Sequence, residues 1–78
     1  MGYIKTLDDN RYLNHKFVVG FKIEKKQVLI NPFHLYVDMT DGASRCIGAF
    51  PTHEAASQEI ERLIEELYVN KRLVVEVK

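Results

Sequence analysis

Apolar and polar residues alternate with a period of two in two segments of this 78-residue chain: KFVVGFKIEK (16–25) and FHLYVDM (33–39). Such alternation is typical of β-strands that turn one face to a core and the other to solvent. The predicted core-facing sets are Phe17, Val19, Phe21 and Ile23 in the first strand and Phe33, Leu35, Val37 and Met39 in the second. SRCIGAF (44–50) is the expected third strand, with Cys46, Gly48 and Phe50 on one face and Ile47 and Ala49 on the other.

A different period follows, in HEAASQEIERLIEEL (53–67), where apolar residues recur every three to four positions. This spacing predicts one amphipathic α-helix. Thr52 is the expected N-cap and Glu54 complements the positive end of the helix dipole, while Asn70 and Lys71 are expected to stop the helix. The apolar stripe consists of Ala56, Ile60, Leu63, Ile64 and Leu67.

Turn residues separate the remaining segments. Asp41-Gly42 predicts a tight turn that joins the second and third strands into a hairpin. LDDN (7–10) predicts a turn between the short strands YIKT (3–6) and RYL (11–13). VLINP (28–32) is compatible with a strand extension or with an irregular apolar loop. Because Pro32 cannot donate to a sheet ladder, any strand here would be an edge strand or would end at this residue.

The last segment, RLVVEVK (72–78), predicts a C-terminal strand with Leu73, Val75 and Val77 on one face. The whole chain is therefore expected to be a single α+β domain of residues 1–78: a mainly antiparallel sheet of four to five strands, one helix packed on one face, and a final strand. Its predicted core is Phe17, Phe21, Leu35, Val37, Ile60, Leu63, Ile64 and Leu67.

Composition narrows the class of protein. The chain is 46% hydrophobic and 28% charged, and its eleven basic residues balance eleven acidic ones. A zero net charge does not favour a nucleic-acid binder, since phosphate attraction dominates that affinity. The single cysteine excludes an internal disulfide, and no apolar run reaches membrane-spanning length. We expect a cytoplasmic protein without a membrane partner.

Residues with catalytic or metal-binding chemistry do not fall into a recognisable motif. His15, His34, Cys46 and His53 lack metal-ligand spacing, so no metal and no cofactor is expected. Cys46 lies in mid-strand, which favours a small buried or half-buried thiol over an activated nucleophile. Asp38 and Asp41 bracket the hairpin turn, and no catalytic residue is assigned. We expect a protein that is not an enzyme.

Two surfaces remain as candidate binding sites. Lys22, His34, Tyr36 and Arg45 could project together from one sheet face and stack bases or hold phosphates. The alternative is an ordinary solvated face with cross-strand ion pairs. The second candidate is the C-terminal strand, whose edge could pair within the chain or with a second copy in a homodimer. Its residues are Leu73, Val74, Val75 and Val77.

YIKTLDDNRYLN, FVVGFKIEK and IGAFPTHEAASQEIERLI together resemble a group of small uncharacterised proteins from phages and low-GC Gram-positive bacteria. The resemblance covers residues 3–67, and this chain departs from the pattern in VLINPF and in its last strand. It implies a phage-related protein and supplies no catalytic residues. The matching positions are Gly48, Phe50, Thr52, Glu54, Ala55 and Ala56.

Residues 35–64 also resemble the arm-binding N-terminal domains of phage integrases, which combine three strands, a glycine-aromatic turn and a helix. That resemblance implies DNA binding through basic and aromatic sheet positions, of which Tyr36 and Arg45 are present here. Taken together, the sequence favours a non-enzymatic protein-interaction or accessory factor whose protein partner is unknown. The alternative is a nucleic-acid-binding module that uses the open sheet face.

Overall fold

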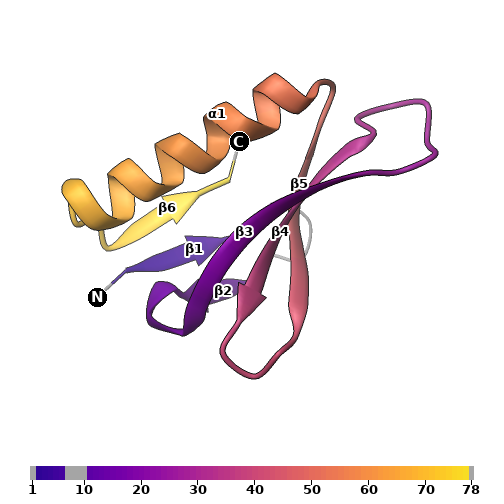
Figure 1. The fold of residues 1–78 in the computed structure, drawn as a ribbon. Coiled ribbons are helices and arrows are strands. Elements are labelled where there is room, and N and C mark those ends of the chain that lie inside the picture. Colours follow the sequence, from indigo (N-terminus) through magenta and orange to yellow (C-terminus); the bar gives the residue numbers. More distant parts are fainter. Residues whose placement is uncertain (1, 7–10, 78) are drawn as a thin grey trace.

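The computed structural model describes residues 2–6 and 11–77, which form six strands, one α-helix and two short helical turns (Figure 1). The predicted turn at 7–10 lies outside the described residues. The elements are β1 (Tyr3–Lys5), β2 (Tyr12–Asn14), η1 (His15–Phe17), β3 (Val18–Lys25), β4 (Phe33–Met39), β5 (Ser44–Phe50), α1 (His53–Ile64), η2 (Glu65–Val69) and β6 (Val74–Glu76).

The strands divide into two three-stranded sheets instead of one larger sheet. The larger is an antiparallel meander in the order β3-β4-β5. The smaller has the order β2-β1-β6, in which β1 is antiparallel to β2 and parallel to β6. The predicted α+β class with one helix and mainly antiparallel strands is confirmed, but the single sheet of four to five strands is not.

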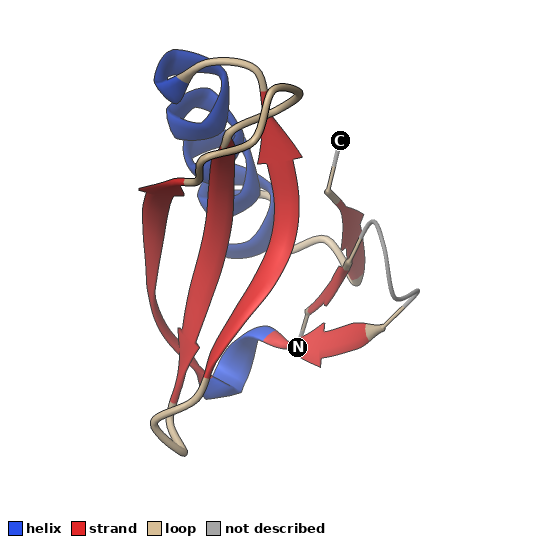
Figure 2. Cartoon of the chain, turned by 90° about the vertical axis from the view of Figure 1, so that its right-hand side faces the viewer, coloured by secondary structure: helices blue, strands red, loops and turns tan. Residues whose placement is uncertain are grey.

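A 3₁₀ turn separates β2 from β3 and redirects the chain from one sheet to the other. The side chain of Asn14 accepts a hydrogen bond from the backbone N–H of Lys16 and caps this turn. Figure 2 shows the two sheets as separate groups of arrows, with the turn between them. The sharp change of direction explains why β2 does not continue into the ladder of β3.

Helix α1 lies across the larger sheet and contacts all three of its strands. The hydroxyl of Thr52 accepts a hydrogen bond from the N–H of Ala55 at 3.0 Å, so the predicted N-cap is confirmed. The helical chain continues through the π-helical turn η2 and ends at Asn70, after which Lys71 adopts a positive φ of 52°. The predicted stop is confirmed as well.

Charged side chains connect α1 to the C-terminal strand. Arg62 forms a two-bond ion pair with the buried carboxylate of Glu59, at 2.8 and 2.7 Å, and also donates to the backbone carbonyl of Glu76. The hydrogen bond to Glu59 raises the pKa of Arg62 above its ordinary value. The same guanidinium therefore satisfies a buried carboxylate and holds the helix to β6.

One hydrophobic core joins the helix and both sheets. Four of the predicted core residues, Leu35, Val37, Leu63 and Leu67, are buried, while Phe21 and Ile60 are half-buried and pack against them. The small sheet contributes residues that the predicted core did not include. These are Ile4, Leu13, Val75 and Val77.

Three residues predicted to face the core are exposed. Phe17 lies in η1, before β3 begins, and Val19 lies at a β-bulge between Val18 and Gly20. A bulge inserts one extra residue and resets which face each later residue occupies. Phe21 and Ile23 therefore face the core, whereas Val19 does not. Ile64 lies at the edge of the helical stripe and is 41% exposed.

A second bulge, in β5, places Cys46 and Gly48 on opposite faces, although the sequence pattern assigned them to one face. Leu35 pairs with Gly48 and Tyr36 pairs with Cys46, so Ile47 is the extra residue. Ile47 is buried and Cys46 is exposed, which corrects the expectation of a buried or half-buried thiol. Its Sγ contacts the carbonyl of Gly48 at 3.5 Å.

The C-terminal strand approaches β5 closely at Gly48. A Cβ atom at this position would lie 2.9 Å from Cγ1 of Val77, which is closer than side chains pack. Val77 and Val75 are buried, as predicted for the last strand, but Leu73 precedes β6 and is exposed. The absence of a side chain at Gly48 thus lets the end of the chain pack against the larger sheet.

Candidate functional site

Three of the predicted sheet-face residues lie on the outer face of the larger sheet, away from α1. In the β3–β4 ladder Lys22 pairs with Tyr36 and Glu24 pairs with His34, so these side chains share one face. The ammonium groups of Lys22 and Lys26 lie 5.8 and 5.3 Å from the centre of the Tyr36 ring. This is the geometry of cation–π contact.

Carboxylates offset these ammonium groups. Glu24 lies 3.0 Å from Lys26 and 3.5 Å from Lys22, and Asp38 lies 3.8 Å from Lys22. The hydrogen bond from Lys26 lowers the pKa of Glu24, and the same bond raises the pKa of Lys26. Two lysines therefore face two carboxylates around Tyr36, an arrangement that attracts phosphate weakly.

Arg45, the fourth predicted residue, is not brought to this face. It pairs with Val37, a fully buried residue on the opposite face of the sheet, and its guanidinium lies 3.9 Å from Asp41. The bulge at Ile47 is the cause, because regular pairing from Leu35 onward would place Arg45 opposite Asp38 on the outer face. The predicted four-residue surface is thus reduced to three residues.

The predicted edge-strand surface lies at one edge of the small sheet. β6 pairs with β1 in parallel, with Val74 opposite Tyr3 and Val75 opposite Ile4. Leu73 and Val74 are exposed at this edge, while Val75 and Val77 are part of the core. Only the first half of the predicted set is therefore available to another molecule.

A small hollow of about 290 Å³ lies beside the end of the helix. The rings of His15 and Tyr68 stack there with centres 5.2 Å apart, and Arg72 pairs with Glu66 at 2.8 Å. Nδ1 of His15 is buried and has no hydrogen-bond partner among the described residues. A methyl group on Gly2 would clash with Leu67 in this hollow, so the backbone itself forms one wall.

The most exposed apolar residues of the described chain are on the connection between β3 and β4, a segment that we call the hairpin end (residues 26–32). Val28, Leu29 and Ile30 follow one another there with exposed fractions of 49%, 102% and 79%. Figure 1 shows this connection extending away from the rest of the molecule, beyond the start of α1.

The backbone of the hairpin end is held in a defined shape. The N–H of Lys26 donates to the carbonyl of Pro32 at 2.7 Å and closes the loop. Asn31 has a φ of 51°, a left-handed conformation that asparagine tolerates better than most residues. The aliphatic side chains are therefore displayed from a closed turn.

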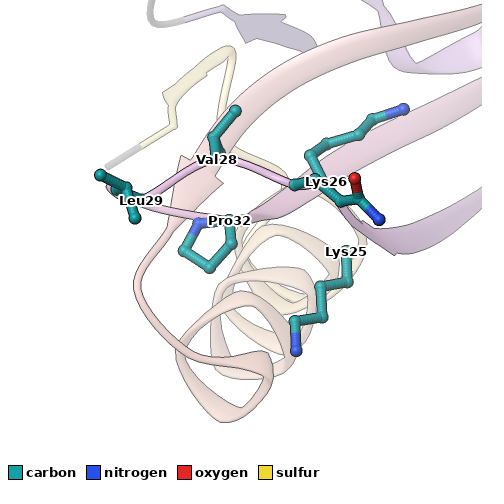
Figure 3. A pocket seen from close by; sticks show the side chains of 6 residues that line it. Lys25, Lys26, Val28, Leu29 and Pro32 are labelled. Carbon is teal, nitrogen blue, oxygen red and sulfur yellow. The ribbon is translucent and has the colours of Figure 1, made fainter.

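A hollow of about 530 Å³ lies against this turn and is lined by the aliphatic residues, by Lys25 at the end of β3 and by Lys26, which follows it (Figure 3). Of the alternatives for VLINP, the structure forms the irregular apolar loop. The signal in the sequence was a run of three apolar residues without alternation, placed between a lysine pair and a proline. The lining residues are Lys25, Lys26, Gln27, Val28, Leu29 and Pro32.

Side chains with catalytic chemistry are separated in space. Within residues 2–6 and 11–77, His, Cys, Asp and Glu form no group of three that could hold a metal ion. His34 is on the outer sheet face, His15 beside Tyr68, and His53 against the ring of Phe33. In the same part of the chain, every helix is too short or too polar to span a bilayer.

Comparison of the chain with protein-family models, with curated proteins and with solved structures finds no match in any of the three. The class defined here is therefore structural: a small α+β fold with two three-stranded sheets and one helix.

Proposed function

We propose that this chain is a non-enzymatic protein-interaction module that contacts its partner through the hairpin end. The observation that carries the proposal is the consecutive exposure of Val28, Leu29 and Ile30 on a closed turn. Scattered single apolar residues are normal on protein surfaces, whereas grouped ones mark interaction sites. Burial of these side chains against a partner would contribute about 25 cal/mol of favourable free energy for each Å² of apolar surface removed from water.

The distribution of reactive side chains supports a role without catalysis. A general base, a nucleophile and an oxyanion donor must converge within hydrogen-bond reach to act on one substrate. Here Cys46 and His34 are on different strands of an open face, and His53 is at the start of α1. The partner-binding interpretation requires no such convergence.

Site-specific photo-crosslinking tests the proposal. A photoreactive amino acid placed at Leu29 should give a discrete adduct with one host protein in the native host. The same amino acid at Ser44, which is exposed at the start of β5, is the matched control and should give none. Absence of a protein adduct from Leu29 would overturn the hairpin end as the contact surface, and absence of any adduct from Tyr36 and Val74 as well would overturn the protein-interaction function.

A specific observation favours the second candidate, a nucleic-acid-binding module: the Tyr36 ring lies beside two ammonium groups. Retention of labelled single-stranded DNA and RNA at increasing salt measures this activity. Affinity that falls steeply with salt and is lost in Tyr36→Ala would replace the first proposal by the second. Because Glu24 and Asp38 offset the lysines, we expect little retention.

We also propose, as a lesser element, that Leu73 and Val74 at the β6 edge support homodimer formation. Exposed sheet edges offer unpaired backbone groups to a second copy. Sedimentation at several concentrations measures the mass. A monomeric mass without concentration dependence would remove the dimer and leave the hairpin-end proposal intact. The phage-related origin implied by the sequence resemblance is proposed alongside, and neighbouring genes would test it.

A further inference from the structure

The hollow at the hairpin end is lined by both aliphatic and charged side chains. Val28, Leu29 and Pro32 supply aliphatic surface, while Lys25 and Lys26 border it. Figure 3 shows the two lysine side chains extending away from each other on either side of the chain. A ligand that fills this hollow therefore meets both aliphatic carbon and ammonium groups.

The two lysines are not equivalent. Lys26 is paired with Glu24 at 3.0 Å and contacts the Tyr36 ring. Lys25 lies 5.9 Å from the centre of the Phe33 ring, and within residues 2–6 and 11–77 no carboxylate is within ion-pair distance of it. Its charge is available to a ligand without the loss of an existing ion pair.

Resting on the proposed function, we infer that the hairpin end binds an extended segment of a partner protein in which a large aliphatic side chain lies close to a carboxylate. The aliphatic side chain packs on Leu29 and Pro32, and the carboxylate pairs with Lys25. The apolar contact contributes affinity, and the ion pair with Lys25 makes the site prefer acidic segments over basic ones.

An anionic bilayer is the competing occupant, and the local charge disfavours it. In and beside the hairpin end, Lys22, Lys25 and Lys26 carry three positive charges and Glu24 and Asp38 carry two negative ones, a net charge of +1. Attraction to anionic lipid grows with each uncompensated positive charge at the surface, and stable anchoring takes more than one signal. A single carboxylate on a partner protein matches the charge of Lys25 better.

Selection from a displayed library of random dodecapeptides tests the inference with a defined probe. We expect enrichment of peptides that contain Leu, Ile or Phe within two positions of Asp or Glu. A synthetic peptide of the enriched sequence should shift backbone amide signals of residues 25–32 in NMR spectra. Its affinity should fall about tenfold in Leu29→Asp and several-fold in Lys25→Glu, because each change removes one of the two contacts.

Val19→Asp is the matched control, since it places the same charge at another exposed aliphatic position and should leave the affinity unchanged. All three altered positions, Val19, Lys25 and Leu29, are exposed, so the folded state survives the changes. Enrichment of basic peptides, or of none, would overturn the inference. Binding to phosphatidylglycerol vesicles that is lost in Leu29→Asp would overturn it in favour of the bilayer.

The outcomes separate this inference from the proposed function. If the Leu29 crosslink to a host protein forms but the selection fails, the chain is an interaction module whose partner has different chemistry. If the selection succeeds while the crosslink fails in the host, the hairpin end binds such peptides but is not the contact with a partner protein, which overturns the proposed function and the inference that rests on it. Selected peptides that shift signals of Leu73 and Val74 instead would overturn the hairpin-end site.

Discussion

Two neighbouring residues of α1 provide a direct test of how the helix packs. Leu63 is fully buried against the sheets, whereas Ile64 is 41% exposed, although the sequence pattern assigns both to the core stripe. The substitutions Leu63→Ala and Ile64→Ala remove the same number of carbon atoms from adjacent positions. The difference between their effects therefore reports mainly burial, with a smaller contribution from the lower helix propensity of isoleucine.

The expected magnitudes follow from burial. Removing three buried carbon atoms at Leu63 costs about 2.5 kcal/mol in transfer free energy, and the cavity raises the loss in unfolding free energy to about 3 kcal/mol. At Ile64, truncation of the partly exposed side chain lowers the unfolding free energy by about 1 kcal/mol or less, and the better helix propensity of alanine offsets about 0.4 kcal/mol of this. The two variants should differ by about 2 kcal/mol.

Urea denaturation followed by circular dichroism at 222 nm measures the difference. For a domain of this size it corresponds to about 8–16 °C between the two midpoints of thermal unfolding. The slope of unfolding free energy against urea concentration should be the same in both variants, since the native fold is retained. If Leu63→Ala is already unfolded in water while Ile64→Ala unfolds cooperatively, the predicted order holds. Equal losses, or a larger loss at Ile64, would refute the packing described here.

Three further changes test other contacts. Gly48→Ala should lower the unfolding free energy by about 1–3 kcal/mol, because the new methyl group overlaps Val77. In a double-mutant cycle, adding Val77→Ala to the same chain should restore part of this loss. Losses that simply add would contradict the close approach of Gly48 and Val77. Thr52→Ala should cost about 1 kcal/mol by thermal unfolding and Thr52→Ser almost nothing, whereas equal losses would argue against the N-cap. The pKa of Glu24 lies below its ordinary 4.5 because Lys26 donates a hydrogen bond, so the ion pair stabilises the fold above pH 4.5 and is lost as pH falls below it. Glu24→Gln should then flatten the stability profile below pH 4.5, and an unchanged profile would exclude the pair.

The candidate surfaces differ in how far the sequence could define them. Lys22, His34 and Tyr36 were correctly predicted to share a face, because β3 and β4 pair regularly from Gly20 onward. Arg45 was grouped with them only by assuming the same regularity in β5, where the bulge at Ile47 breaks it. A bulge adds one residue without changing the apolar composition, so the period-two pattern does not reveal it.

The hairpin end illustrates a different limit. The sequence showed three consecutive apolar residues followed by an asparagine and a proline, which allowed a strand or a loop. Their exposure depends on where the β3–β4 ladder stops, with Lys25 opposite Phe33, and on the closing bond between Lys26 and Pro32. Neither contact can be derived from local propensity.

The sequence by itself determined the local elements: the three long strands, the capped helix and its stop, and most of the apolar stripe that covers the larger sheet. These depend on residues within a few positions of one another. Tertiary structure alone decided that β1 and β6, at opposite ends of the chain, pair in parallel and form a second sheet. Parallel pairing of distant segments is set by which apolar surfaces remain uncovered once the helix has packed, and no local pattern records that outcome.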